Sequence, residues 1–350
     1  MKSIDITKFA RPHILNLKPY SSARDEYTGV AGTFLDANEN PLGSATDENF
    51  NRYPDPYQWE VKKALSPIKG VNPENTFLGN GSDEAIDLLF RAFCEPKADN
   101  VITLPPTYGM YQVCADINLV DVITVPLTTD FQLDVDGILE AVTPSTKLIF
   151  ICNPNNPTGN KLDEKAILKI LDEFNGLVVI DEAYIDFSDH TSFTNLLSEY
   201  QNLVVLQTFS KAWGLAALRI GMAFASKEII TLLNKIKYPY NINQLTQEKA
   251  LESLKNVRKK EQMVREILQE RAELIKVFEQ LPLVKHIYPS HANFLLIKVD
   301  EPVKIYQFLI DKLIIVRDRS KVMLCEGCLR ITVGTAKENK DLIEALKAFQ

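Results

Sequence analysis

Short runs of apolar residues alternate with amphipathic stretches along the first two thirds of the chain. The runs are apolar at consecutive positions, which is typical of strands buried on both faces of a sheet. They lie at residues 101–104, 147–151, 177–181, 203–209 and 220–225. Amphipathic segments with helical spacing, such as residues 164–174, lie between several of them. The alternation predicts an α/β fold with a mostly parallel sheet sandwiched by helices.

The pattern changes after Pro239. Residues 244–280 are almost unbroken helix formers, which predicts one long helix, or two in succession, leading to a second domain. Beyond it, we expect a smaller α+β domain with strands at 292–299, 313–316 and 329–333 and helices at 303–309 and 339–349. The predicted division is an N-terminal arm (1–34), a large domain (35–243), and a linking helix with a small domain (244–350). Other predicted elements are helices at 59–68, 82–93 and 107–117, and a strand at 120–127.

Composition excludes several classes of protein. The net charge is −7 and no basic block is present, so nucleic acid is not an expected partner. No charge-free apolar run reaches the roughly 18 residues needed to span a membrane. The N-terminus has charges throughout and no apolar signal region, and five cysteines in 350 residues indicate a reducing compartment. We therefore expect a cytoplasmic protein.

The segment TFSKAWGLAALRIG (208–221) carries the first candidate chemistry. Lys211 follows a buried strand, at the sheet edge where α/β proteins bind ligands. Partial desolvation there favours a neutral, nucleophilic amine, which can form a Schiff base with a carbonyl such as that of pyridoxal phosphate. Ser210 and Arg219 are residue types that bind phosphate. Alone, the pattern also fits an ordinary loop lysine and a surface arginine.

Upstream segments add candidates, each with a structural alternative. GNGSDEA (79–85) places glycines before a helix N-terminus, which favours an anion. Tyr108 could stack on a planar ring or pack in the core. NPNNPTG (153–159) forms a fixed turn, in which Asn156 offers an amide to a ligand or simply supports the turn. Asp181, in DEAY, stands at the end of a strand. It is either the partner of a buried cationic group or the N-cap of the following helix.

Taken together, these segments resemble the fold type I pyridoxal phosphate-dependent aminotransferases. The order is kept, with 25 residues from Asn156 to Asp181 (181 − 156) and 30 from Asp181 to Lys211 (211 − 181). DANENPLG (36–43), RYPDP (52–56) and GNGSDE are similar to the histidinol-phosphate branch of that family. The resemblance extends from Tyr20 to about Val333. It implies pyridoxal 5'-phosphate as cofactor and a homodimer with shared active sites.

The resemblance also implies roles for individual residues. Lys211 would form the Schiff base and shuttle a proton, and Asp181 would pair with the pyridine nitrogen, which a buried anion keeps protonated. Asn156 and Tyr184 would hydrogen-bond the ring oxygen, and Tyr108 would stack on the ring. The phosphate would be held by the backbone of Ser82 and Asp83 at the helix start, together with Ser210 and Arg219. Tyr53 would reach the phosphate from the neighbouring subunit, and Thr208 is also expected to bind the cofactor.

Substrate-binding residues follow from the same resemblance. Arg330 matches the family arginine that takes the anionic end of the substrate, and Arg317 matches a second arginine of the histidinol-phosphate branch. Tyr20 would add a hydroxyl from the arm, while Asn38 and Asn40 would shape the entrance. The implied reaction is transamination of L-histidinol phosphate with 2-oxoglutarate, giving imidazole acetol phosphate and L-glutamate in two half-reactions through pyridoxamine phosphate. Without the other motifs, each arginine could equally be a solvated strand-end residue.

Some features depart from the pattern or leave alternatives open. Trp213 stands where a smaller aromatic is expected and Ala217 where glycine is common. A single Cys325-x-x-Cys328 is weak evidence for zinc, and the four histidines show no ligand spacing, so no metal is expected. The alternative functions are an aromatic amino acid aminotransferase, a threonine-phosphate decarboxylase, and a non-catalytic regulator. An intact Lys211 and the lack of a basic helix speak against the regulator.

Overall fold

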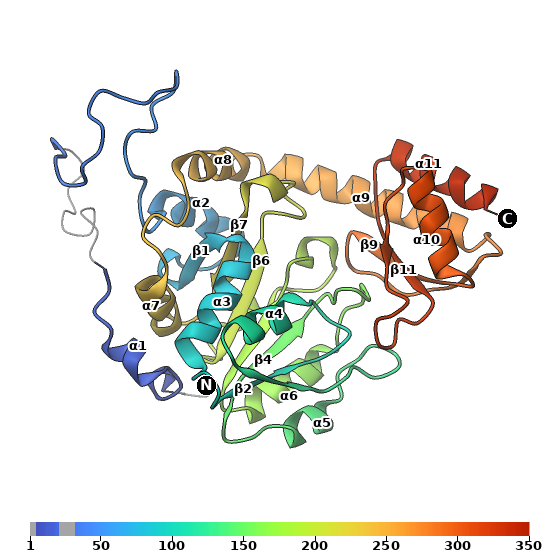
Figure 1. Cartoon of the computed structure of the whole chain (residues 1–350), viewed down its shortest axis with the longest axis horizontal. Coiled ribbons are helices and arrows are strands. Elements are labelled where there is room, and N and C mark those ends of the chain that lie inside the picture. Colours follow the sequence, from blue (N-terminus) through green and yellow to red (C-terminus); the bar gives the residue numbers. More distant parts are fainter. Residues whose placement is uncertain (1–4, 21–31, 350) are drawn as a thin grey trace.

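The computed structural model describes residues 5–20 and 32–349. Its larger sheet has seven strands in the order β1-β7-β6-β5-β4-β2-β3 (Figure 1). They are β1 (Thr76–Asn80), β2 (Asn100–Thr103), β3 (Asp121–Thr124), β4 (Thr146–Cys152), β5 (Leu177–Asp181), β6 (Leu203–Thr208) and β7 (Ile220–Phe224). β7 is antiparallel to β1 and β6, and the other neighbouring pairs are parallel. The predicted mostly parallel sheet is confirmed.

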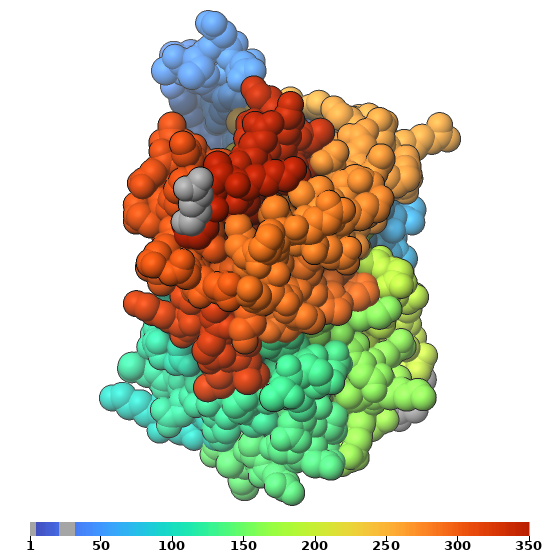
Figure 2. All heavy atoms as spheres, turned by 90° about the vertical axis from the view of Figure 1, so that its right-hand side faces the viewer, coloured from blue at the N-terminus to red at the C-terminus, as the bar shows by residue number. Residues whose placement is uncertain are grey.

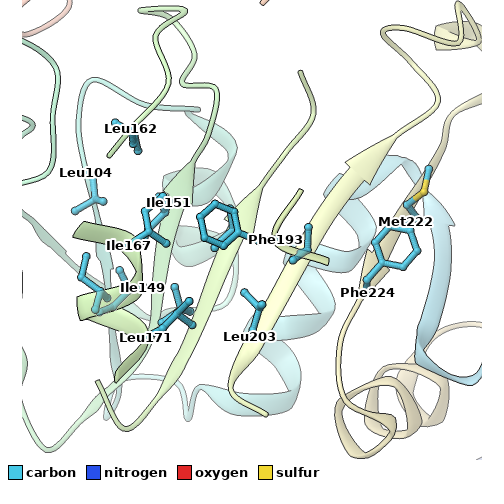
Figure 3. Close-up of a cluster of buried hydrophobic side chains, with 14 of the residues drawn as sticks. Leu104, Ile149, Ile151, Leu162, Ile167, Leu171, Phe193, Leu203, Met222 and Phe224 are labelled. Atoms are coloured by element: carbon cyan, nitrogen blue, oxygen red, sulfur yellow. The ribbon is translucent and has the colours of Figure 1, made fainter. Parts of the chain in front are cut away.

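Helices cover both faces of this sheet, which explains why the central strands β4, β5 and β6 are apolar at nearly every position. In β4, Leu148 and Phe150 pack into one buried cluster. Ile149 and Ile151 pack into another cluster on the opposite face, which Figure 3 shows. The first cluster includes α3 (Gly81–Phe93), α4 (Met110–Ile117) and α7 (Lys227–Ile236). The second includes α2 (Trp59–Lys69), α6 (Glu164–Glu173) and α8 (Gln244–Leu254). Two short helices, α1 (Pro12–Asn16) and α5 (Val135–Glu140), complete this part.

A smaller antiparallel sheet forms the second domain, as expected. Its strand order is β10-β11-β9-β8, with α10 and α11 packed against it. The elements are β8 (Val284–Ile287), β9 (Phe294–Val299), α10 (Pro302–Asp311), β10 (Arg317–Asp318), β11 (Cys328–Thr332) and α11 (Ala336–Ala348). α9 (Val257–Phe278) leads into this domain, so residues 244–280 form two helices rather than one. Figure 2 shows the C-terminal residues, orange to red, lying directly above the green part of the large domain.

Three details of the element prediction were wrong. Residues 313–316 are not a strand and pair with no strand among the described residues. Leu313 has φ 59°, which interrupts an extended backbone, and is 88% exposed. β8 was missed because its polar residues, Lys285 and His286, hide the apolar pattern of a short edge strand. The helix predicted at 107–117 begins only at Met110.

Candidate active site

A pocket opens at the carboxyl ends of β4, β5 and β6, beside the N-terminus of α3. It contains every cofactor residue predicted from the sequence except Tyr53, although these residues are spread over more than a third of the chain. The lining residues are Gly81, Ser82, Asp83, Tyr108, Asn156, Asp181, Ala183, Tyr184, Thr208, Ser210, Lys211 and Arg219. The topology explains this meeting, because neighbouring parallel strands place their carboxyl ends at one edge of the sheet.

Asp181 is the buried acid of the pocket. It is 3% exposed, and its carboxylate accepts hydrogen bonds from the Tyr111 hydroxyl at 2.8 Å and from the Ala183 backbone N–H at 3.1 Å. Burial raises the pKa of Asp181 to about 6, and the hydrogen bond from Tyr111 works against this rise. The hydrogen bond from the Ala183 N–H shows that the carboxylate also caps the turn after β5. Asp181 therefore has part of the capping role that was its structural alternative. A buried carboxylate with a raised pKa is nevertheless suited to a cationic partner.

Tyr111 was missed in the sequence analysis, where it belonged to a predicted amphipathic helix. It is fully buried, stacks on Phe150 with ring centroids 4.7 Å apart, and meets Tyr108 edge-on at 5.6 Å. A buried hydroxyl usually finds a partner, but the sequence does not show that this partner is Asp181. The sequence signal that could have indicated it is the three-residue spacing of Tyr108 and Tyr111, which would put both on one face of the predicted helix 107–117.

We expect Tyr111→Phe to weaken cofactor binding and to shift its pH dependence. Loss of a hydrogen bond to a buried charged acceptor costs about 1.5–3 kcal/mol, or roughly 10- to 100-fold in affinity. Without the donor, the pKa of Asp181 should rise further, so binding should fail at a higher pH than in the wild type. The measurement is the affinity of the apoprotein for pyridoxal phosphate between pH 5 and 8. Tyr238→Phe, at an exposed position, is the matched control; equal pH profiles for all three proteins would contradict the expectation.

Lys211 lies at the mouth of the same pocket. Its Nζ is 5.7 Å from the ring centroid of Tyr184. The pKa of Lys211 is lowered, first by desolvation and then by the positive charge of Arg330, while Asp181 opposes the shift. The residue as a whole remains accessible to solvent, so the lowered pKa reflects the surroundings of the amine rather than complete burial. A reachable amine with a lowered pKa is a suitable nucleophile toward a carbonyl carbon.

The N-terminus of α3 forms an anion cradle. Its N-cap residue, Asn80, makes no side-chain capping hydrogen bond. The Gly81 N–H donates to the Arg219 carbonyl at 2.9 Å, which leaves the N–H groups of Ser82 and Asp83 to bind a ligand. Gly221 allows β7 to approach, since a Cβ there would lie 2.2 Å from the Ser82 nitrogen. Arg219 adopts φ 50° and brings its guanidinium to Ser210 Oγ at 3.4 Å and to Asp83 at 3.2 Å.

These groups fit pyridoxal phosphate. The anion cradle suits its phosphate, Asp181 suits the protonated ring nitrogen, and the amine of Lys211 suits its aldehyde. Tyr108 is held beside the pocket by a hydrogen bond from its hydroxyl to Asp83 at 3.0 Å. The fit therefore rests on an uncapped helix start, a buried acid and a reachable amine within one pocket.

The NPNNPTG turn is both a rigid turn and a source of ligand-binding groups. Asn155 is buried and donates to the Pro106 carbonyl at 2.8 Å and to Thr158 at 2.6 Å. Asn153 accepts from the Leu162 N–H at 2.9 Å. These two asparagines support the fold, whereas Asn156 faces the pocket. The two interpretations of the motif therefore apply to different residues.

Arg330 connects the small domain to the pocket. Its guanidinium donates to the side-chain carbonyl of Asn156 and lies over the ring of Phe294, 5.2 Å from the centroid. Phe294 in turn meets Tyr184 edge-on at 5.1 Å. Arg317 lies directly opposite Arg330 on the neighbouring strand. The structure thus places both predicted arginines on the small sheet, with Arg330 in contact with a pocket residue.

Besides the two arginines, four predicted residues do not line this pocket within the same chain, namely Tyr20, Asn38, Asn40 and Tyr53. Tyr20 is 75% exposed. Tyr53 stacks on Tyr240 with centroids 4.5 Å apart, and it lines a separate hollow together with Asn38. Their roles stay predictions, because a single chain does not bring them to Lys211.

Metal binding, membrane insertion and cysteine chemistry were also considered for residues 5–20 and 32–349. No group of three or more histidine, cysteine or acidic side chains could hold a metal ion there. No helix in those ranges is long and apolar enough to cross a membrane. Cys325 and Cys328 are both buried, and burial raises the pKa of Cys325 to about 12, which disfavours the reactive thiolate. They act as packing residues.

Comparison with known proteins gives a consistent result. The family described as aminotransferase class I and II matches residues 26–346. A histidinol-phosphate aminotransferase of Cytophaga hutchinsonii is 58% identical over 347 residues, covering 99% of this chain and 100% of that protein.

Solved structures share the fold. The histidinol-phosphate aminotransferase of Clostridium acetobutylicum has a TM-score of 0.78 at 24% identity, covering 85% of this chain and 90% of that one. That of Sinorhizobium meliloti, solved in complex with pyridoxal-5'-phosphate, has a TM-score of 0.77 at 23% identity, covering 89% and 90%.

Proposed function

The chain belongs to the aminotransferase class I and II family, and we propose that it transfers the amino group of L-histidinol phosphate to 2-oxoglutarate. The products are imidazole acetol phosphate and L-glutamate, and the reaction serves histidine biosynthesis. The observation that carries the proposal is the meeting of Lys211, Asp181 and the anion cradle of α3 in one pocket below Arg330. The full-length relative at 58% identity supports the same substrate.

The cofactor is pyridoxal 5'-phosphate, which when bound supplies an electron sink and carries the amino group between donor and acceptor. The N–H groups at the start of α3 would hold its phosphate, together with Ser210 and Arg219. The carboxylate of Asp181 would keep the ring nitrogen protonated by charge, and Tyr108 would stack on the ring.

The reacting groups of the chain do the proton chemistry and the positioning. The amine of Lys211 would hold the aldehyde of the cofactor and, once released from it, would take the proton from the α-carbon of the donor, which its lowered pKa favours. Burial raises the pKa of Tyr184, so its hydroxyl stays protonated and would donate a hydrogen bond to the ring oxygen. The amide of Asn156 would donate to the same oxygen, and the contact of its carbonyl with Arg330 connects this position to the small domain.

The substrate end of the site must hold two different anions in turn. The donor carries a phosphate monoester and no carboxylate, whereas glutamate carries carboxylates. Arginine suits both, because its planar fork pairs with either group. Arg330 and Arg317, with the hydroxyl of Tyr20, would surround a phosphate of charge about −1.5 to −2.

A second copy of the chain completes the site in this proposal. Residues 35–53 carry exposed apolar side chains, with Leu35 86%, Leu42 94% and Tyr53 51% exposed. Large exposed apolar groups gathered on one extended segment mark an interface. The partner copy would bring Tyr53 to the cofactor phosphate and Asn38 to the entrance. All five cysteines are unpaired, which agrees with the reducing cytoplasm where we place this homodimer.

The test compares donors across arginine and tyrosine variants. Arg330→Ala should slow both half-reactions, because both substrates need its guanidinium, by roughly 10²- to 10⁴-fold if two charged hydrogen bonds are lost. Arg317→Ala and Tyr20→Phe should reduce kcat/KM for L-histidinol phosphate more than for phenylalanine or tyrosine. The measurement is single-turnover kinetics with each donor and with glutamate.

The wild-type protein decides between the proposal and its alternatives. A higher kcat/KM for phenylalanine or tyrosine than for L-histidinol phosphate would replace the proposal with an aromatic aminotransferase. Release of CO2 from threonine phosphate, without transfer of the amino group to 2-oxoglutarate, would replace it with a decarboxylase.

A further inference from the structure

Three arginines share one face of the small sheet, and the sequence analysis singled out only two of them. Arg317 lies opposite Arg330 in the antiparallel pair β10–β11. The backbone N–H of Arg319 donates to the carbonyl of Cys328 at 2.9 Å, so the pairing continues one residue beyond β10. Because side chains two residues apart on a strand point to the same face, Arg319 lies on the face that carries Arg317 and Arg330.

This face is turned toward the large domain. Cys328, opposite Arg319, packs into a cluster that contains residues of the large domain. The neighbouring residues Leu329 and Ile331 pack on the other face, in the core of the small domain. The contact of Arg330 with Asn156 fixes the direction of the shared face toward the pocket.

The positive charge on this face is not neutralised by the described part of the protein. None of the three arginines forms an ion pair with a carboxylate within residues 5–20 and 32–349. The Nε of Arg319 is buried and has no hydrogen-bond partner there. Asp318 is next in sequence, but it lies on the opposite face and accepts from the Ser320 N–H at 2.7 Å.

Electrostatics supports the same conclusion. The pKa of Arg319 is lowered, first by burial and then by the like charge of Arg317. The pKa of Arg330 is also lowered, mainly by burial, and both other arginines contribute. A partly buried cation without a partner costs free energy, so a bound anion would relieve this cost.

The number of guanidinium groups indicates which anion the face is built for. One planar fork satisfies a carboxylate, which has two oxygens and a single charge. A phosphate monoester has three terminal oxygens and a charge of about −1.5 to −2, so it can use a third guanidinium that a carboxylate cannot. We infer that Arg319 is a further substrate-binding residue that sets the preference for a phosphorylated donor over an unphosphorylated one, which rests on the function proposed above.

The test uses the holoenzyme and two variants of this position. Arg319→Gln should lower kcat/KM for L-histidinol phosphate by about 10- to 100-fold, the range for losing a hydrogen bond to a charged group. The value for unphosphorylated L-histidinol should stay close to that of the wild type. Arg319→Lys should be intermediate, because lysine keeps the charge but not the fork. The inhibition constant of inorganic phosphate should rise in the same order, from wild type to lysine to glutamine.

Arg265→Gln is the matched control, since it removes one arginine charge from an exposed position on α9. Equal ratios of the two donors in Arg319→Gln and Arg265→Gln would overturn the role of Arg319. An equal loss for both donors with a lowered melting temperature would also overturn it, because it indicates a structural role. A wild-type protein that does not prefer the phosphorylated donor would overturn the proposed function itself, before any arginine is changed.

Discussion

Replacement of Lys211 by alanine should abolish transamination while the protein still folds and binds pyridoxal phosphate weakly. The amine is the nucleophile and the proton carrier in the proposed mechanism. The other described residues that line the pocket include no lysine that could replace it. Non-covalent contacts remain, because the anion cradle of α3 and Asp181 are untouched. The measurement is turnover with L-histidinol phosphate and 2-oxoglutarate, together with the mass of the protein after borohydride reduction in the presence of the cofactor.

The wild type should gain the mass of the reduced cofactor on Lys211, and the alanine variant should gain none. Lys255→Ala is the control, since Lys255 is an exposed lysine at the end of α8. A variant that keeps full turnover, or that still carries the cofactor covalently, would show that another amine does this chemistry.

The sheet could be predicted from the sequence because strands that are buried on both faces have apolar residues at consecutive positions. β4, β5 and β6 are apolar at nearly every position, and the pocket lies where they end. The Asn, Asp and Ser-Lys motifs follow these strands directly, so sequence order alone brings Asn156, Asp181 and Lys211 to one edge.

The rest depends on long-range packing that the sequence does not show. Tyr111 is one of two aromatic residues in the predicted helix 107–117, and its hydroxyl reaches Asp181 because α4 packs against the same face of the sheet as Phe150 and Cys152. Arg319 stands beyond a two-residue strand, and its face is fixed by the register with β11. A strand was predicted at β7, but the apolar pattern does not predict its direction. That direction is set by its antiparallel pairing with β1 and β6.

Asp181→Asn should keep the fold and lose about 10²–10³ in rate, the usual cost of removing one preorganised electrostatic partner. An amide can hydrogen-bond the ring nitrogen but cannot hold its proton by charge. The measurement is kcat with L-histidinol phosphate at saturating cofactor. Near-normal activity would show that the carboxylate only caps the turn at Ala183.

The same substitution should make the apoprotein more stable at high pH. Burial raises the pKa of Asp181 from 3.8 to about 6 in the folded state, so the folded protein binds this proton more tightly than the unfolded chain. Its contribution to stability is therefore complete below the unfolded pKa and is lost as the pH rises through about 6. The difference between the two pKa values corresponds to roughly 3 kcal/mol at about 1.4 kcal/mol per pKa unit.

Apoprotein carrying Asp181→Asn should therefore melt at a higher temperature than wild-type apoprotein at pH 8, and the two should converge toward pH 5. Saturating pyridoxal phosphate should reverse the order at pH 8, because only the carboxylate gains a cationic partner. Thermal unfolding of both proteins at pH 5 and pH 8, with and without cofactor, checks each part. A gap of the same size at both pH values would mean that packing, and not the charge of Asp181, separates the two proteins. The reversal would show that the acid which destabilises the empty pocket is stabilised by the ligand that the pocket is built to hold.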